Sequence, residues 1–196
     1  SLNETYPSLN AEAVIRARNF DMAFIDALAE TGLPIVAGVF TAAVGNPHES
    51  EFDLLVPLAR KCEQAGGYMG YHNYWWVQNE VSTLETEWKY FAGRWAEMDR
   101  VFVANGVHVR WYGGESGAYE SVERGWRHPV CFNGDWGAYL ADIMRIDQLI
   151  AEWNAANGDR FAGLVLFTSG ISTGWAWFQV RDPELADIEK LILERY

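Results

Sequence analysis

Two glutamates stand at positions where their carboxyl groups are suited to chemistry. Glu4 follows Asn3 near the start of the chain, at what we expect to be the end of a strand. Glu115 follows another apolar segment and lies between Gly114 and Gly117, where it has no helix surface to cover. Hydrolysis of a glycosidic bond needs such a pair, because one carboxylic acid protonates the leaving oxygen while the other carboxylate attacks or activates water. The two residues are therefore candidates for a catalytic pair, whereas most glutamates of this chain are expected on solvated helix faces.

Polar and aromatic residues follow other apolar segments in the same way. His72 and Tyr74 come at the end of one of them, with Trp75 directly after, and Trp175 follows the last one. His72 can contact a substrate, but a lone histidine at a strand end is also a common hydrogen-bonding residue of the structure. Asn3 has two similar interpretations, since it can bind a substrate hydroxyl or cap a turn. Trp75 and Trp175 either line a sugar-binding cleft or shield the top of the fold.

Helical and extended segments alternate along the whole chain. Apolar residues recur every three or four positions in the helical segments, as in 11–30, which ends before Gly32. Short continuous apolar runs between these segments are typical of strands buried on both faces. Ser50, Asp135 and the pair Asp182-Pro183 are expected helix starts. The pattern predicts helices at 11–30, 51–65, 84–104, 135–156 and from 182, strands at 33–40, 68–76 (with its loop), 108–112 and 161–170, and a long loop at 113–134.

This alternation predicts an α/β fold with a parallel sheet and crossover helices. An open doubly wound sheet and a (β/α)8 barrel both fit the order of elements. A doubly wound sheet would carry a glycine-rich phosphate turn, but Gly45-Asn46-Pro47 lacks the G-x-G-x-x-G spacing. The polar residues instead gather after the carboxyl ends of successive strands, which is where a barrel builds its active site. We therefore predict one domain, 1–196, of the (β/α)8 TIM-barrel type.

The composition limits the classes of function. The 196 residues carry a net charge of −12 without a basic patch, which argues against nucleic acid, and no apolar stretch is long enough to span a membrane. Aromatic residues make up 15%, with ten Trp, which suits either a carbohydrate cleft or a large aromatic core. Cys62 and Cys131 are expected to be free thiols, and the four His show no metal-ligand spacing. No cofactor is implied, and the localisation is not predicted.

In the types and order of these residues, the chain resembles the retaining glycoside hydrolases of clan A. In that clan an Asn-Glu pair at the end of the fourth barrel strand supplies the acid/base, which corresponds to Asn3-Glu4. A Glu at the end of the seventh strand is the nucleophile, which corresponds to Glu115. Many members carry His-x-Tyr at the end of the sixth strand, here His72-Asn73-Tyr74, and the tyrosine typically orients the nucleophile. The eighth strand commonly delivers a Trp to the sugar-binding floor, here Trp175 or Trp177.

The resemblance implies an enzyme that hydrolyses O-glycosidic bonds of a carbohydrate substrate with retention. It numbers the four predicted strands as the fifth to the eighth, and Asn3-Glu4 as the end of the fourth. Only the fourth to eighth strand–helix units of a barrel are therefore expected. Two sheet edges would then be unpaired, and we expect self-association or further N-terminal barrel units to cover them. The chain departs from the family in having Thr5-Tyr6 after Glu4, where Pro is frequent. Two alternatives stay open: a non-catalytic carbohydrate-binding protein on a degenerate barrel, and an unrelated parallel α/β enzyme.

Overall fold

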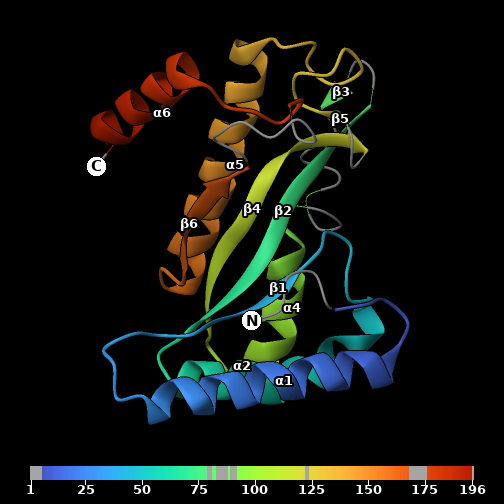
Figure 1. The fold of residues 1–196 in the computed structure, drawn as a ribbon, viewed down its shortest axis with the longest axis vertical. Helices are drawn as coiled ribbons and strands as arrows, with labels where there is room; N and C mark the ends of the chain where they lie inside the picture. Colours follow the sequence, from blue (N-terminus) through green and yellow to red (C-terminus); the bar gives the residue numbers. More distant parts are fainter. Residues whose placement is uncertain are drawn as a thin grey trace.

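A parallel sheet of four strands forms the centre of the computed structural model, which describes residues 6–78, 81–82, 88, 92–121, 124–167 and 176–195. In this sheet β2 (Tyr68–Gln78) pairs with β1 (Gly38–Ala42) and with β4 (Arg110–Ser121), and β4 pairs in turn with β6 (Phe161–Leu166). Two short antiparallel strands, β3 (Val81–Ser82) and β5 (Arg124–Gly125), pair with the carboxyl ends of β2 and β4 (Figure 1). The predicted α/β class is confirmed.

Helices flank each strand of the parallel sheet along the chain. They are α1 (Ala11–Glu30) before β1, η1 (Glu49–Leu55) and α2 (Val56–Gln64) before β2, α4 (Arg94–Ala104) before β4, α5 (Trp136–Asn157) before β6, and α6 (Asp182–Arg195) after it. Side-chain caps explain two of these starts. The Asn10 Oδ1 atom accepts from the amide of Ala13 at 3.1 Å, and the Asp135 Oδ1 atom accepts from the amide of Ala138 at 3.0 Å. The cap of η1 is His48 rather than the predicted Ser50.

An aromatic layer joins α4 and α5 to one face of the sheet, which we call the helix side. Trp95 of α4 contacts Trp111 of β4 at a ring-centroid distance of 6.0 Å, Trp153 of α5 at 4.6 Å and Phe161 of β6 at 4.4 Å. Most of the tryptophan side chains that the structure describes belong to this core or pack against it: Trp75, Trp95, Trp111 and Trp126 are buried, and Trp88, Trp136 and Trp153 are partly buried. The high tryptophan content is therefore mainly a property of the core.

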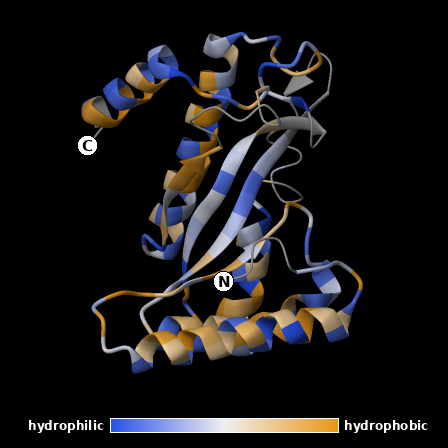
Figure 2. Cartoon of the chain, viewed as in Figure 1, coloured by the Kyte–Doolittle hydropathy of each residue, from blue (hydrophilic) through white to orange (hydrophobic). Residues whose placement is uncertain are grey.

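The two central strands are less apolar than parallel strands usually are. Figure 2 colours β2 and β4 white to blue over much of their length, whereas β6 is largely orange. Glycines and tyrosines account for part of this difference, and His72, Asn73 and Glu115 are hydrophilic positions within the two strands. Polar side chains in the middle of a sheet need partners or a function, because burying them without either is costly.

Three predicted boundaries are wrong. The first strand begins at Gly38 rather than at residue 33. The helix before β4 begins at Arg94 rather than at residue 84, since residues 88, 92 and 93 are in turns. The strand β4 continues to Ser121 instead of ending at residue 112, because it pairs with β2 as far as Tyr119. Glu115 therefore lies within a strand and not in a loop after one.

The strands lie in the sheet in the order in which they occur in the chain. Going from β1 to β2, β4 and β6, there is no reversal of the kind that defines a doubly wound sheet. Within the described part of the chain β1 and β6 are the edges of the parallel sheet, so the sheet is open there and its closure into a barrel is not seen. Among the helices described, none has the length and apolar character needed to cross a bilayer.

Candidate active site

An irregularity in the pairing of β2 with β4 decides where Glu115 points. Tyr71 pairs with Gly113, but the next residue of β2, His72, pairs with Glu115, so Gly114 is an extra residue in β4. Side chains alternate between the two faces of a strand, and one extra residue reverses the alternation beyond it. Without the bulge, Glu115 would point to the helix side. The bulge places it on the opposite face, which we call the site face, beside His72.

Tyr74 and His72 contact the Glu115 carboxylate on the site face. The Tyr74 hydroxyl donates to Glu115 Oε2 at 3.0 Å, and His72 Nδ1 lies 3.6 Å from the same oxygen. The Glu115 side chain is 28% exposed, whereas the His72 side chain is 1% exposed. The buried His72 ring and the partly buried Tyr74 hydroxyl thus hold one oxygen of the Glu115 carboxylate, and this carboxylate still reaches the surface. Such an oriented carboxylate can act as a nucleophile or as a general base.

Aromatic rings from the far end of the chain support Tyr74. Its ring meets Phe167 at 6.2 Å and Phe178 at 6.3 Å between centroids, both in edge-to-face geometry. Gly125 makes room for this contact, since a Cβ atom there would stand 2.5 Å from the Phe178 ring. The sequence gives no signal for these two phenylalanines, because their contact with Tyr74 joins segments far apart in the chain. They hold the donor that orients Glu115.

Trp177, next to Phe178, is exposed. Its side chain is 44% exposed, while the other tryptophan side chains in the described part of the chain are buried or partly buried. The Trp177 carbonyl accepts from the amide of Arg127 at 2.9 Å, and the His128 ring packs edge-on against the indole at 4.9 Å. An exposed indole on a backbone held in this way is a suitable surface for the flat face of a sugar ring.

The structure brings together only some of the predicted site residues. Asn3, Glu4 and Trp175 lie outside the described residues. Trp75 lies on the helix side, because consecutive residues of a strand point to opposite faces and Tyr74 points to the site face. Its indole is 2% exposed, stacks on Tyr139 of α5 at 5.7 Å and donates to Asp142 at 2.9 Å. Trp75 is therefore a core residue on the helix side and does not lie on the site face with Glu115.

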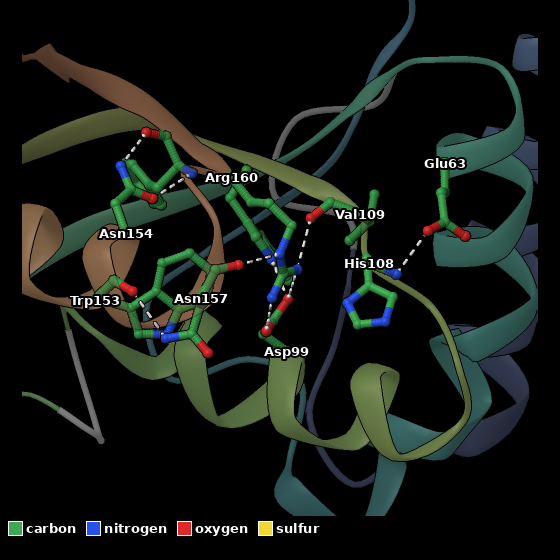
Figure 3. A network of polar contacts seen from close by, with 10 residues as sticks. Glu63, Asp99, His108, Val109, Trp153, Asn154, Asn157 and Arg160 are labelled. Atoms are coloured by element: carbon green, nitrogen blue, oxygen red, sulfur yellow. Dashed lines mark hydrogen bonds and ion pairs between the residues drawn. The ribbon is translucent and has the colours of Figure 1, made fainter.

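A second carboxylate, Asp99 of α4, lies near the amino ends of β4 and β6 (Figure 3). Arg160 binds it with two nitrogens, at 2.6 and 2.8 Å, and the Trp111 indole donates to it at 2.9 Å. Arg160 also donates to the Val109 carbonyl at 3.1 Å, and its guanidinium lies over the ring of Trp153. Because its charge is paired and its oxygens are occupied, Asp99 is suited to holding helix and sheet together and not to binding a substrate.

No family model, curated protein or solved structure matches this chain. Among the residues that the structure describes, no group of three or more His, Cys, Asp or Glu is arranged to hold a metal ion. A functional proposal therefore depends on the geometry of Glu115, Tyr74 and His72.

Proposed function

We propose that this protein hydrolyses O-glycosidic bonds of a carbohydrate with retention of configuration. The observation that carries the proposal is Glu115, turned to the site face by a bulge, oriented by Tyr74 and flanked by His72. These three residues occupy the positions of the nucleophile and of the His-x-Tyr motif in the resemblance to clan A. Exposed Trp177, the chain neighbour of the Phe178 that packs on Tyr74, adds a surface of the kind that carbohydrates bind.

In the proposed reaction Glu115 attacks the anomeric carbon, and the bond from that carbon to the leaving oxygen breaks. Glu4, as the acid, gives its proton to the leaving oxygen, and a covalent glycosyl-enzyme forms on Glu115. Glu4, now ionised, takes a proton from water, and the oxygen of that water attacks the same carbon. The sugar is released with its original configuration, Glu115 is again a carboxylate and Glu4 is again protonated. Asn3 would bind the hydroxyl next to the reacting carbon, and Trp175 would contact the sugar.

We also propose that the four parallel strands are the fifth to eighth strands of a (β/α)8 barrel. Their sequential order supports this, because a barrel is wound in one direction whereas a doubly wound sheet reverses. In such a barrel the free edges of β1 and β6 pair with further strands, supplied by other units of the same polypeptide or by a second copy. No cofactor takes part in this mechanism.

The nucleophile can be identified by trapping it. In the full-length polypeptide, a panel of activated 2-deoxy-2-fluoroglycosides that differ in their sugar should add one fluorosugar to the peptide containing Glu115, as read by mass spectrometry. Glu115→Gln should abolish the label, and Glu12→Gln, which changes an exposed glutamate of α1, should label like the natural protein. A label on another residue would assign the nucleophile elsewhere. If no sugar in the panel gives either a label or turnover, the hydrolase proposal is refuted.

The roles of the two glutamates can be separated by the stereochemistry of azide rescue. Glu115→Ala removes the attacking group, so azide should enter its place and give an adduct of inverted configuration. Glu4→Ala keeps the nucleophile, so a substrate with a good leaving group should still form the glycosyl-enzyme, and azide should give the retained adduct. Proton NMR distinguishes the two products. The opposite assignment of products would exchange the two roles.

A further inference from the structure

Tyr112 of β4 lies across two neighbouring strands on the site face. It pairs with Gly70 of β2, and a Cβ atom added to Gly70 would stand 2.5 Å from Cζ and 2.6 Å from the hydroxyl oxygen of Tyr112. Gly70 and His72 are two residues apart on β2, so both face the site. A Cβ atom on Gly38 of β1 would stand 3.3 Å from the same hydroxyl oxygen. The phenol therefore extends from β4 over β2 and reaches β1.

Gly70 is an unfavourable residue for the middle of a strand. Glycine loses more conformational freedom on folding than other residues, and it has no side chain to pack against its neighbours. An interior strand glycine therefore often marks a place where another group approaches the backbone closely. In β2 this glycine is the residue paired with Tyr112, and the approaching group is the Tyr112 ring. The strand gives up a side chain so that the ring can lie on it.

The extra residue of β4, Gly114, lies between the rings of Tyr112 and His72. A Cβ atom on Gly114 would meet Cδ2 of His72 at 3.4 Å and Cε2 of Tyr112 at 3.5 Å, which are ordinary van der Waals distances. Gly114 is the residue that turns Glu115 to the site face, and His72 Nδ1 lies 3.6 Å from Glu115 Oε2. The Tyr112 ring therefore borders both features that place the carboxylate, the bulge and the imidazole.

The side chain of Tyr112 is neutral at the pH at which the carboxylate is ionised. Burial, followed by the neighbouring groups of Asp21 and Cys62, raises the pKa of the Tyr112 hydroxyl above its usual value. The hydroxyl therefore keeps its proton near neutral pH and brings no charge to the site face. An effect of Tyr112 on Glu115 has to come from the shape and position of its ring.

We propose that Tyr112 is a positioning residue for Glu115, because its ring, lying on Gly70, holds the bulge at Gly114 and the His72 ring in place. The proposal rests on the proposed function, since Glu115 is a nucleophile only there. The ring and not the hydroxyl carries the effect. Loss of the ring should therefore impair attack by Glu115, and a variant that keeps the ring should behave like the natural protein.

The first test measures the rate of fluorosugar labelling of Glu115 in the full-length polypeptide. Tyr112→Leu removes the ring and should slow labelling about tenfold or more, because a small misplacement of a reacting group costs up to about 100-fold. Tyr112→Phe should restore the natural rate. Tyr68→Leu is the matched control, since Tyr68 is also partly buried, lies two residues before Gly70 and packs against the Arg110 guanidinium at 4.1 Å. Normal labelling in Tyr112→Leu, or an equal fall in Tyr68→Leu, would overturn the proposal.

The second test displaces the ring without changing Tyr112. The added methyl group of Gly70→Ala would stand 2.5 Å from Cζ of Tyr112, so the ring must move and labelling of Glu115 should fall. Residues that act through one contact have non-additive effects. Gly70→Ala combined with Tyr112→Leu should therefore label no more slowly than Tyr112→Leu alone. If the two falls multiply instead, the two residues act separately on Glu115, and the role assigned to the ring is wrong.

The third test is spectroscopic and needs no activity. The magnetic field of an aromatic ring shifts the NMR resonances of protons close to it, so the Cδ2 proton of His72 reports the Tyr112 ring. Its resonance, assigned with a His72→Asn variant, should move in Tyr112→Leu and in Gly70→Ala and stay in place in Tyr68→Leu. An unchanged resonance in Tyr112→Leu would overturn the contact on which the proposal depends.

The natural protein separates this proposal from the proposed function. If it labels at Glu115 and Tyr112→Leu labels at the same rate, the function stands and the positioning role falls. If it gives neither a label nor turnover with any sugar of the panel, the proposed function falls, and the role of Tyr112 in catalysis falls with it. A shifted His72 resonance would then report only the packing of the two rings.

Discussion

Asp99 lies near the amino ends of β4 and β6, where its side chain is 3% exposed and accepts from two Arg160 nitrogens and the Trp111 indole. The Glu115 side chain lies further along β4, is 28% exposed and accepts from the Tyr74 hydroxyl. Both acids pack against the same sheet, Asp99 from helix α4 and Glu115 from within β4, and among the described residues only Asp99 has its charge paired with an arginine. A paired, buried carboxylate is unavailable to a substrate, and an oriented, partly exposed one is available. The difference indicates which end of the sheet is built for stability and which for chemistry.

Replacing a carboxylate by its isosteric amide should have a larger effect on stability at Asp99 than at Glu115. Asp99→Asn removes the charge that compensates buried Arg160, and breaking a buried pair in this way costs about 3–5 kcal/mol of the free energy of unfolding. Urea unfolding measures this loss. Asp53→Ala, which removes an exposed acid in η1, should change stability by less than about 0.5 kcal/mol. A loss below about 1 kcal/mol in Asp99→Asn would remove the contrast with Glu115.

An intermediate effect is expected at the bulge that turns Glu115 to the site face. In Gly113→Ala the new Cβ would stand 2.4 Å from the Asn73 amide nitrogen and 2.7 Å from Leu164 Cδ2, so the strand must shift. Overpacking of this kind costs about 1–3 kcal/mol. Gly114→Ala is the control, because its Cβ would meet no atom closer than 3.4 Å. We expect labelling of Glu115 to fall in Gly113→Ala and to persist in Gly114→Ala. Equal labelling in the two variants would show that the strand geometry at the bulge does not position Glu115.

The smallest effect on stability is expected at Glu115 itself. Glu115→Gln keeps an acceptor oxygen for the Tyr74 hydroxyl and, among the described residues, leaves no arginine unpaired, so the free energy of unfolding should change by less than about 1 kcal/mol. The same variant should lose the fluorosugar label and the turnover of the full-length polypeptide. A loss of stability as large as that in Asp99→Asn would mean that Glu115 is a structural acid and would weaken the proposed function.

Much of the fold can be predicted from local patterns. The helix 11–30 agrees with α1, and the helix from Asp135 agrees with α5, because apolar periodicity and a capping side chain act within a few residues of each other. The alternation of elements also predicts a parallel sheet correctly. The extent of β4 could not be read in this way, since Gly113, Gly114 and Gly117 are typical of a loop and only pairing with β2 makes them a strand. The barrel, Glu4 as acid/base and the contacts of Asn3 and Trp175 remain predictions.

The sequence by itself selected Glu115, His72 and Tyr74 as candidates, because their types and their places after apolar runs are local facts. Only the tertiary structure decided that they share a face. That outcome depends on one extra residue, Gly114, in a pairing between two strands that are distant in the chain. Trp75 shows the converse, since a residue directly beside Tyr74 in sequence is sent into the core by the alternation of the strand. The direction of a side chain in a sheet is set by register, and register is a property of two segments together.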